Sequence, residues 1–277
     1  MSMDHYCVMG NPVAHSRSPW IHTRFAELTR QNLTYDKREI PLDQFYTCVH
    51  QFISDGGCGC NITVPFKFQA AALATQTSER ALMAQASNVL TFRDGQILAD
   101  NTDGIGLVMD IERNAGVPLK GKRLLLIGAG GAAAGVLGPL IHAQPAHITV
   151  ANRTLAKAAE LVARHQTSKL LQETELTAQD IKGLEGDFDV IINGTASSLV
   201  GQGVPVSHQV LKPGALAYDM MYGSAAQGFM DWASEHGAVA RDGLGMLVEQ
   251  AAEAFQIWRG VRPPSTQVLA ELRQVVG

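Results

Sequence analysis

The sequence predicts an α/β fold with two domains, one of which is a doubly wound parallel sheet. The first reason is length, because 277 residues suit one large or two modest domains and can bury a sizeable core. The second is that short apolar strand patterns alternate with helical patterns along most of the chain. The third is that this alternation restarts near Arg123 with longer apolar strands, which indicates a second sheet.

The first hundred residues predict an N-terminal α/β domain. Ser18-Pro19 is typical of a helix start, with serine as the N-cap and proline in the first turn. Asp94-Gly95 between two apolar segments predicts a hairpin. The predicted strands are 6–9, 34–40, 59–64, 89–92 and 96–99, and the predicted helices begin at 19 or span 44–53, 66–74 and 79–86.

The second series predicts a Rossmann-type domain. A helix over 105–114 should end at Gly116, and strands are expected at 124–127, 148–151, 190–193, 215–219 and 238–240. Two helices, 246–259 and 266–276, should close the chain. We therefore predict one domain from residues 1–102 and 242–277, and a second from residues 103–241.

Composition excludes several classes of protein. With 22 basic and 26 acidic residues the net charge is −4, which does not provide the basic surface that nucleic acids need. The nine histidines are scattered and the four cysteines form no C-x-x-C pair, so no metal site is expected. The uncharged stretch 124–141 is interrupted by five glycines and Pro139, so we expect a strand, a turn and a helix, not a membrane span.

The N-terminus and the cysteines bear on location. Asp4 comes early and no apolar run of signal-peptide length follows it, so we expect no signal peptide. Cysteines without a paired spacing are typical of reduced thiols. A cytoplasmic protein is therefore expected, with no membrane partner.

A glycine-rich turn at residues 128–133 predicts a dinucleotide site. The motif G-x-G-x-x-A follows an apolar strand and begins an apolar helix, the context in which a pyrophosphate lies on the helix N-terminus. Gly128 would allow the turn, Gly130 would allow close approach of the phosphates, and Ala133 would allow close packing of helix on strand. The alternative is a tight turn that binds nothing.

The end of the next strand favours NADP over NAD. NAD sites place a carboxylate there for the ribose 2′-hydroxyl, whereas this sequence has Asn152-Arg153-Thr154 with Lys157 one turn later. Arginine and lysine suit a 2′-phosphate, and arginine can also stack on adenine. The alternative is that Arg153 and Lys157 are a solvated helix start.

Several polar motifs give the sequence a resemblance to the shikimate dehydrogenase family. They are NPVAHSRSP at 11–19, NITVPFK at 61–67, DNTDG at 100–104, DMMY at 219–222 and DGLGMLVEQAAEAF at 242–255, together with the glycine-rich turn. The resemblance implies an N-terminal domain that binds shikimate and a Rossmann domain that binds NADP. It also implies reversible reduction of 3-dehydroshikimate to shikimate in aromatic amino-acid biosynthesis, by hydride transfer to substrate C3.

The resemblance also implies roles for individual residues. Lys67 and Asp103 would be the catalytic pair, a reading the chemistry supports because an ammonium can stabilise and protonate a developing alkoxide. Further substrate contacts would be Ser16, Ser18, Thr63, Asn88, Tyr222 and Gln250, with the two serines on the carboxylate. The cofactor would contact Glu79, Gly128, Ala129, Gly130, Gly131, Ala132, Asn152, Arg153, Thr154, Lys157, Met220 and Gly243.

Most of these residues also have a structural interpretation. Lys67 could be a surface lysine after a proline turn, and Asp103 could be a helix N-cap. The two serines could be turn and cap residues, and Tyr222 could pack at an interface.

The sequence also departs from the family's pattern. The family usually has Val-Asn-Thr where this chain has Ser87-Asn88-Val89, so one hydroxyl is lost beside the substrate asparagine. Lys157 stands where arginine is frequent, which keeps the charge and loses the bidentate fork.

Two other functions fit the sequence. A quinate/shikimate dehydrogenase paralogue would use a substrate with one more ring hydroxyl, an addition that apolar pockets discriminate poorly. A non-catalytic NADP-binding module would need the glycine-rich turn but neither Lys67 nor Asp103. The expected partner is a small molecule, and the chain itself is expected to be a monomer or a homodimer.

Overall fold

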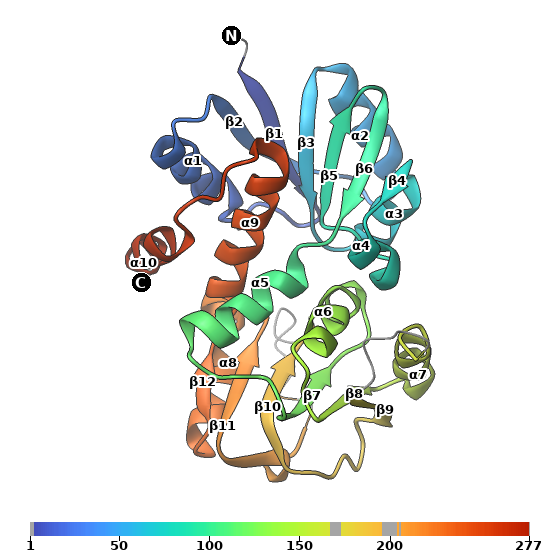
Figure 1. Ribbon diagram of the computed structural model, residues 1–277, viewed down its shortest axis with the longest axis vertical. Coiled ribbons are helices and arrows are strands. Elements are labelled where there is room, and N and C mark those ends of the chain that lie inside the picture. The colour runs from blue at the N-terminus through green and yellow to red at the C-terminus, as the bar shows by residue number, and fades with distance from the viewer. Residues whose placement is uncertain (1–2, 167–172, 196–203, 205, 277) are drawn as a thin grey trace. The chain divides into compact units, whose positions relative to one another are not determined.

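The structure is a computed structural model that describes residues 3–166, 173–195, 204 and 206–276. The chain divides into two compact units, one made of Met1–Gly106 with Leu247–Gly277 and the other of Leu107–Met246. The chain passes from one unit to the other within helix α5 (Asp103–Met109) and returns within helix α9 (Leu244–Arg259) (Figure 1). The predicted fold class, α/β with a Rossmann-type parallel sheet, is confirmed.

The first unit is built on a mixed six-stranded sheet. Its strand order is β2-β1-β3-β5-β6-β4. Strands β1, β2 and β3 are parallel to one another. Strand β5 is antiparallel to β3 and also to β6, with which it forms a hairpin. The strands are β1 (Asp4–Gly10), β2 (Leu33–Glu39), β3 (Gly57–Ile62), β4 (Gln76–Thr77), β5 (Val89–Arg93) and β6 (Gln96–Asp100). The predicted turn forms at Asp94 and Gly95, both with positive φ.

Helices cover both faces of this sheet because its strands alternate apolar side chains toward each face. One core joins Cys7, Met9 and Cys60 of the sheet to residues of α2 and α3, and the other joins Tyr6 and Tyr35 to Trp258 of α9. Helix α10 packs beside α1, where Arg24 forms an ion pair with Glu271. The helices are α1 (Ser18–Thr29), α2 (Phe45–Ser54), α3 (Lys67–Leu73), α4 (Glu79–Ala84), α9 and α10 (Ser265–Val276).

The second unit holds a parallel six-stranded sheet in the order β12-β11-β10-β7-β8-β9. In chain order this is the doubly wound 3-2-1-4-5-6 arrangement, and its switch point lies between β7 and β10. The strands are β7 (Arg123–Ile127), β8 (His147–Asn152), β9 (Glu175–Asp180), β10 (Phe188–Asn193), β11 (Leu211–Asp219) and β12 (Val239–Arg241).

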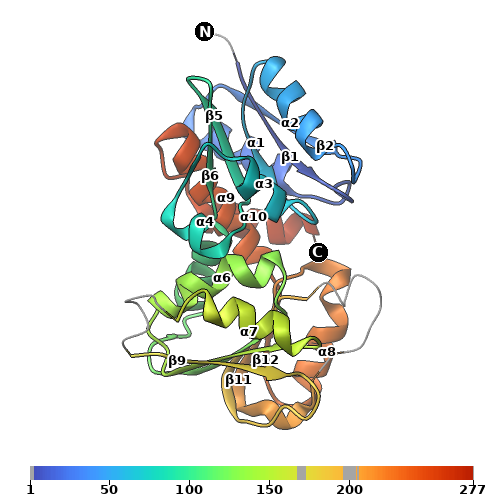
Figure 2. The same cartoon turned by 90° about the vertical axis from the view of Figure 1, so that its right-hand side faces the viewer.

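Strand β7 shows why this sheet must be covered on both faces. Leu124 and Leu126 belong to a core with α6 (Gly131–His142) and α7 (Leu155–Ala163), whereas Leu125 and Ile127 belong to a core with α8 (Gln227–Glu235). Figure 2 shows α6 and α7 on the viewer's side of this unit. The uncharged stretch 124–141 is therefore a buried strand, a turn and a helix, as predicted.

Three local predictions were wrong. Strands β4 and β9 were missed, because β4 has two residues and β9 (ELTAQD) has too few apolar residues to show a pattern. The helix predicted over 105–114 begins at Asp103 and becomes a π-helical turn at Asp110–Asn114. Ser18 is inside α1 and not its N-cap, which is Arg17.

Candidate active site

Lys67 and Asp103 form an ion pair in the first unit. Lys67 is the first residue of α3 and Asp103 the first of α5, and Lys67 Nζ donates to Asp103 Oδ2 at 2.5 Å. The lysine and aspartate side chains are only 13% and 7% exposed. An ammonium has three donors and Asp103 takes one, so the pair can hold a further acceptor and can transfer a proton.

Asn88 and Gln250 complete this cluster. The Thr102 backbone N–H donates to Asn88 Oδ1 at 2.8 Å, so the Asn88 amide nitrogen must face the other side. That nitrogen donates to Asp103 Oδ1 at 2.8 Å and to Gln250 Oε1 at 3.1 Å. Gln250 Nε2 donates in turn to the Leu247 carbonyl within α9. Four residues predicted from distant motifs therefore belong to one hydrogen-bonded cluster.

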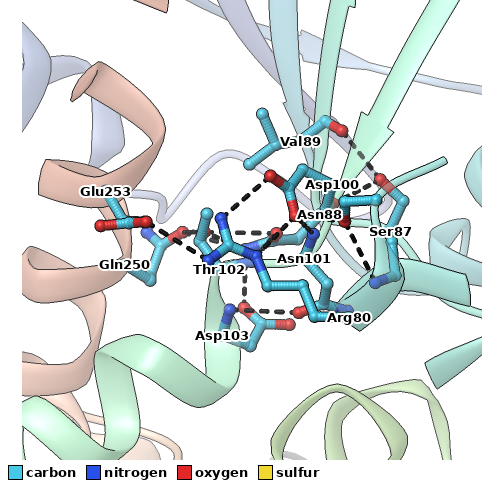
Figure 3. A network of polar contacts seen from close by, with 12 residues as sticks. Arg80, Ser87, Asn88, Val89, Asp100, Asn101, Thr102, Asp103, Gln250 and Glu253 are labelled. Atoms are coloured by element: carbon cyan, nitrogen blue, oxygen red, sulfur yellow. Dashed lines mark hydrogen bonds and ion pairs between the residues drawn. The ribbon is translucent and has the colours of Figure 1, made fainter. Parts of the chain in front are cut away.

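The turn that carries Asp103 is held by a second ion pair (Figure 3). Arg80 of α4 binds both carboxylate oxygens of Asp100, at 2.6 and 2.9 Å, and reaches Glu253 of α9 at 3.3 Å. Asp100 Oδ1 also accepts from Ser78 Oγ and from the Asn101 backbone. The sequence analysis did not identify Arg80, because its partners are distant in the chain.

The serine turn and Thr63 lie on the same unit. Ser18 N donates to Ser16 Oγ at 3.2 Å, and Ser18 is buried while Ser16 is half-buried. Thr63 follows β3 and its methyl group occupies the space above Gly10, where a Cβ would lie 2.2 Å from it. Any residue but glycine at position 10 would therefore displace Thr63.

Asn61 belongs to this region although no role was predicted for it. Asn61 is buried in β3, accepts from the Tyr35 hydroxyl at 2.6 Å and donates to the Asn88 carbonyl at 3.1 Å. A polar amide inside a buried strand was the signal that could have found it, because such groups persist where they are hydrogen-bonded.

Val89 lies in an apolar cluster with Tyr6 and Trp258 and is fully buried. The Ser87 hydroxyl contacts the carbonyls of Val89 and Asp100 at 2.8 and 2.7 Å. Position 89 therefore has no hydroxyl, whereas the hydroxyl at position 87 links β5 to β6 through these two contacts.

The glycine-rich turn lies at the switch point of the second unit's sheet. Gly128 has φ +111°, and a Cβ there would lie 3.2 Å from the Gly194 carbonyl oxygen that follows β10. Gly130 is the N-cap of α6, provides no side-chain cap, and has open space where a Cβ would be. Ala129, Gly131 and Ala132 complete the turn, so backbone N–H groups at this helix start are suited to a pyrophosphate.

The basic residues stand at the adjacent strand end. Asn152 ends β8 and donates to the Thr154 carbonyl at 3.0 Å, and Thr154 is the N-cap of α7. Arg153 and Lys157 are both exposed. The register pairs Asn152 with Asp180 of β9, a carboxylate that the sequence analysis did not place there because it missed β9. Asp180 Oδ1 accepts from the Lys182 backbone.

The remaining predicted residues are divided between the units. Glu79 is exposed at the start of α4 in the first unit, whereas Met220, Tyr222 and Gly243 belong to the second. Gly243 N donates to the Met221 carbonyl at 2.8 Å. A Cβ at Gly243 would lie 2.4 Å from the Met220 carbonyl oxygen, so this close approach requires glycine.

Comparison with known proteins matches three family models to the chain. "Shikimate dehydrogenase substrate binding domain" matches residues 8–90, "Shikimate / quinate 5-dehydrogenase" residues 111–203, and "Shikimate 5'-dehydrogenase C-terminal domain" residues 243–273. A shikimate dehydrogenase (NADP(+)) of Acidovorax ebreus is 64% identical over 99% of this chain and 97% of its own length. The chain belongs to the shikimate dehydrogenase family. The predicted family is confirmed.

Other known proteins are similar to this chain over nearly their whole length. The shikimate dehydrogenase (NADP(+)) of Methylibium petroleiphilum is 54% identical over 99% of this chain and 95% of its own. An Ael1 enzyme from Pseudomonas putida is 46% identical with a TM-score of 0.87, over 97% of this chain and 98% of its own. A shikimate 5-dehydrogenase of Thermus thermophilus, solved with NADP(H) and shikimate, is 27% identical with a TM-score of 0.84, over 98% and 99%.

The described residues provide neither a metal-binding cluster nor a membrane-spanning helix. Within the described residues, no group of three or more His, Cys, Asp or Glu could hold a metal ion. None of the helices in the described part of the chain is long and apolar enough to cross a membrane.

Proposed function

We propose that this member of the family catalyses the NADP-dependent, reversible reduction of 3-dehydroshikimate to shikimate, a step of aromatic amino-acid biosynthesis. The observation that carries the proposal is the 2.5 Å pair of Lys67 and Asp103, bonded to Asn88 and Gln250 in one buried cluster. The 64% identical relative named shikimate dehydrogenase (NADP(+)) supports the same reaction.

Lys67 and Asp103 perform the acid–base part of this reaction in our proposal. NADPH, when bound, supplies a hydride to the carbonyl carbon of the substrate. The carbonyl oxygen then becomes an alkoxide, which the Lys67 ammonium stabilises and protonates. Asp103 accepts from Lys67 on one oxygen and from Asn88 on the other, which keeps the ammonium in place during the step.

The other predicted residues bind and orient. Ser16 and Ser18 near the start of α1 suit the substrate carboxylate, because hydroxyl groups and helix N-terminal N–H groups both donate to anions. Thr63, Tyr222 and Gln250 are assigned to the substrate's hydroxyl groups. Because α6 begins without a side-chain cap, its first N–H groups are assigned to the NADP pyrophosphate, with Arg153 and Lys157 on the 2′-phosphate.

Initial velocities with shikimate and with quinate, each against NADP+ and NAD+, test the proposal directly. We expect the highest kcat/KM with shikimate and NADP+. The "Shikimate / quinate 5-dehydrogenase" match keeps quinate as a second candidate substrate. A protein that binds NADP+ and oxidises neither acid would be the binding module, and the proposal would then be wrong.

Arg153→Ala tests the cofactor assignment. A charged hydrogen bond contributes about 1.5–3 kcal/mol, so the KM for NADP+ should rise roughly 10- to 150-fold while the KM for NAD+ changes little. Arg123→Ala is the matched control, because Arg123 lies at the opposite, amino end of β7. Equal losses for both cofactors would show that Arg153 does not contact the 2′-phosphate.

We also propose a cytoplasmic location, because all four cysteines are free thiols. The expected oligomeric state, monomer or homodimer, stays a prediction.

A further inference from the structure

Arg80 joins two segments of the first unit that are far apart in the chain. Its Nε and Nη2 donate to the two carboxylate oxygens of Asp100 at 2.6 and 2.9 Å, and its Nη1 donates to Glu253 Oε1 at 3.3 Å. Asp100 is the last residue of β6, three positions before Asp103. Glu253 lies three positions after Gln250 on α9, so these two share one side of that helix. The guanidinium therefore bridges the turn that carries Asp103 and the helix that carries Gln250 (Figure 3).

Hydrogen bonds continue from Asp100 to Asp103 through Asn101. Asp100 Oδ1 accepts from the Asn101 backbone N–H at 2.7 Å, and Asn101 Oδ1 accepts from the Asp103 backbone N–H at 3.1 Å. Asn101 is 1% exposed, and its Nδ2 donates to the Ala86 carbonyl at 2.9 Å, which fixes the direction in which the amide faces. These bonds set the position of the first residue of α5, whose carboxylate accepts from Lys67.

Asn88 shows why the turn and α9 must be held together. Its Nδ2 donates to Asp103 Oδ1 at 2.8 Å and to Gln250 Oε1 at 3.1 Å. Its backbone N–H donates to the Asp100 carbonyl at 3.2 Å. One amide nitrogen thus contacts both segments, so both of its bonds depend on how far apart the segments are. The bonds from Arg80 to the two carboxylates are charge-assisted, the stronger kind, and they fix that separation.

We infer that Arg80 is a positioning residue for the Lys67–Asp103 pair, and that it acts through Asp100 and Asn101. Each of its three guanidinium nitrogens already donates to a carboxylate. The inference rests on the proposed function, in which Lys67 and Asp103 perform the acid–base step. It goes further, because it assigns part of the turnover rate to an ion pair outside the groups that contact substrate.

Arg80→Ala tests the inference. Misplacing a reacting group by about 1 Å can lower a rate about 10²-fold, so we expect kcat with shikimate and NADP+ to fall roughly 10- to 100-fold. The KM for shikimate should rise less than about threefold, because the alkoxide that the pair stabilises forms only during the reaction. Arg80→Lys keeps the charge and loses the bidentate fork, so its kcat should lie between those of wild type and Arg80→Ala.

Arg24→Ala is the matched control. Arg24 Nε and Nη2 donate to the two carboxylate oxygens of Glu271 at 2.7 and 3.0 Å, and its Nη1 donates to Glu27 at 2.9 Å. The Arg24 side chain is 32% exposed and that of Arg80 is 26% exposed. Both variants remove an arginine that binds one carboxylate twice and another once, so similar shifts in thermal unfolding are expected. Only Arg80→Ala should lower kcat.

Asn101→Ala interrupts the same path at its next residue and leaves the arginine in place. We expect it to lower kcat more than it raises the KM for shikimate, as Arg80→Ala does. Because both residues act along one path, the double variant should lose less kcat than the product of the two single losses. A loss equal to that product would show that Arg80 and Asn101 act independently, which would contradict the inference. Should Arg80→Ala not fold, Arg80→Lys takes its place in the same comparison.

The outcomes separate the two proposals. If wild type does not oxidise shikimate with NADP+, the proposed function is wrong. If wild type is active and Arg80→Ala has the same kcat as Arg24→Ala, the inference about Arg80 is wrong and the proposed function stands. A KM rise larger than the kcat loss would also contradict it, because Arg80 would then act on substrate binding and not on the catalytic pair.

Discussion

Each unit contains a deeply buried aspartate that is paired with a cation, and these two pairs differ in almost every other respect. In the first unit, Asp103 takes one bond from the Lys67 ammonium and one from an amide. In the second, Asp110 receives two bonds from Arg241, at 2.8 and 2.6 Å, and a third from the Tyr218 hydroxyl at 2.8 Å. Asp110 is fully buried, and a Cβ at Gly245 would lie 1.8 Å from its Oδ1.

The difference separates a pair that can exchange a proton from one that cannot. Arginine does not lose its proton in proteins and its fork holds one geometry, so the Asp110 pair cannot take part in proton transfer. The bond to Asp110 is also the main reason that the pKa of Arg241 is raised. Lysine is a single rotatable ammonium that can give up a proton. Asp103 accepts from one of the three Lys67 donors, which leaves two for other acceptors. Burial of an aspartate therefore does not by itself identify a catalytic residue.

Replacing Lys67 should have the largest effect. We expect Lys67→Ala to lower kcat by about 10²- to 10⁴-fold with a modest change in KM, because the variant lacks the proton donor for the alkoxide. Steady-state kinetics with shikimate and NADP+ measure this. Lys212→Ala is the control, since Lys212 also pairs with an aspartate, Asp189, at an exposed position.

A result for Lys67→Ala in which KM rises and kcat holds would move Lys67 to the substrate-binding residues. Lys67 would then not be the proton donor, and the two ion pairs would no longer differ in proton transfer.

Replacing Asp103 and Asp110 in turn by asparagine tests the difference between the two ion pairs. Asp110→Asn removes a fully buried carboxylate charge that accepts two bonds from Arg241 and one from Tyr218, so it should destabilise the protein by about 3 kcal/mol while kcat at about 25 °C stays within about twofold. Asp103→Asn should do the reverse, with a large loss of kcat and a stability loss of about 1 kcal/mol. Urea unfolding and initial velocities on both variants measure these effects. Equal losses of stability in Asp103→Asn and Asp110→Asn would contradict the proposed difference between the two ion pairs.

His22 is a third kind of buried titratable group, because it has no ion partner in the part of the chain that the structure describes. Burial lowers the pKa of His22 to about 3, from 6.5 in the unfolded chain, and Asn61 opposes this by a smaller amount. Below pH 6.5 the unfolded chain binds a proton that the folded chain does not, so stability falls as the pH falls toward 3. Between about pH 7 and about pH 5.5 this histidine should remove about 1 kcal/mol of stability.

Urea unfolding of wild type and His22→Gln at the two pH values measures this effect. The difference in stability between the two proteins should change by about 1 kcal/mol from about pH 7 to about pH 5.5. His15→Gln, at an exposed position, should keep the full wild-type pH dependence. An unchanged difference for His22→Gln would mean that His22 is protonated in the folded protein.

Much of the fold was predictable because its signals are local. The strand, glycine turn and apolar helix around Gly128 are contiguous in the chain, and so is the hairpin at Asp94-Gly95. Strand β9 was missed because its side chains are only half-buried at the sheet edge, which leaves no apolar alternation to detect. Ser18 was misplaced as an N-cap because serine is a favoured cap residue, whereas backbone geometry makes Arg17 the N-cap although its side chain forms no capping hydrogen bond.

The amino-acid sequence by itself determined the two α/β units, the dinucleotide turn and the family, because these depend on periodicity and on contiguous motifs. It also determined which residue types could perform the chemistry. Only the tertiary structure decided which of them meet, since Lys67, Asn88, Asp103 and Gln250 are up to 183 positions apart and hydrogen bonds between them depend on strand register and helix packing.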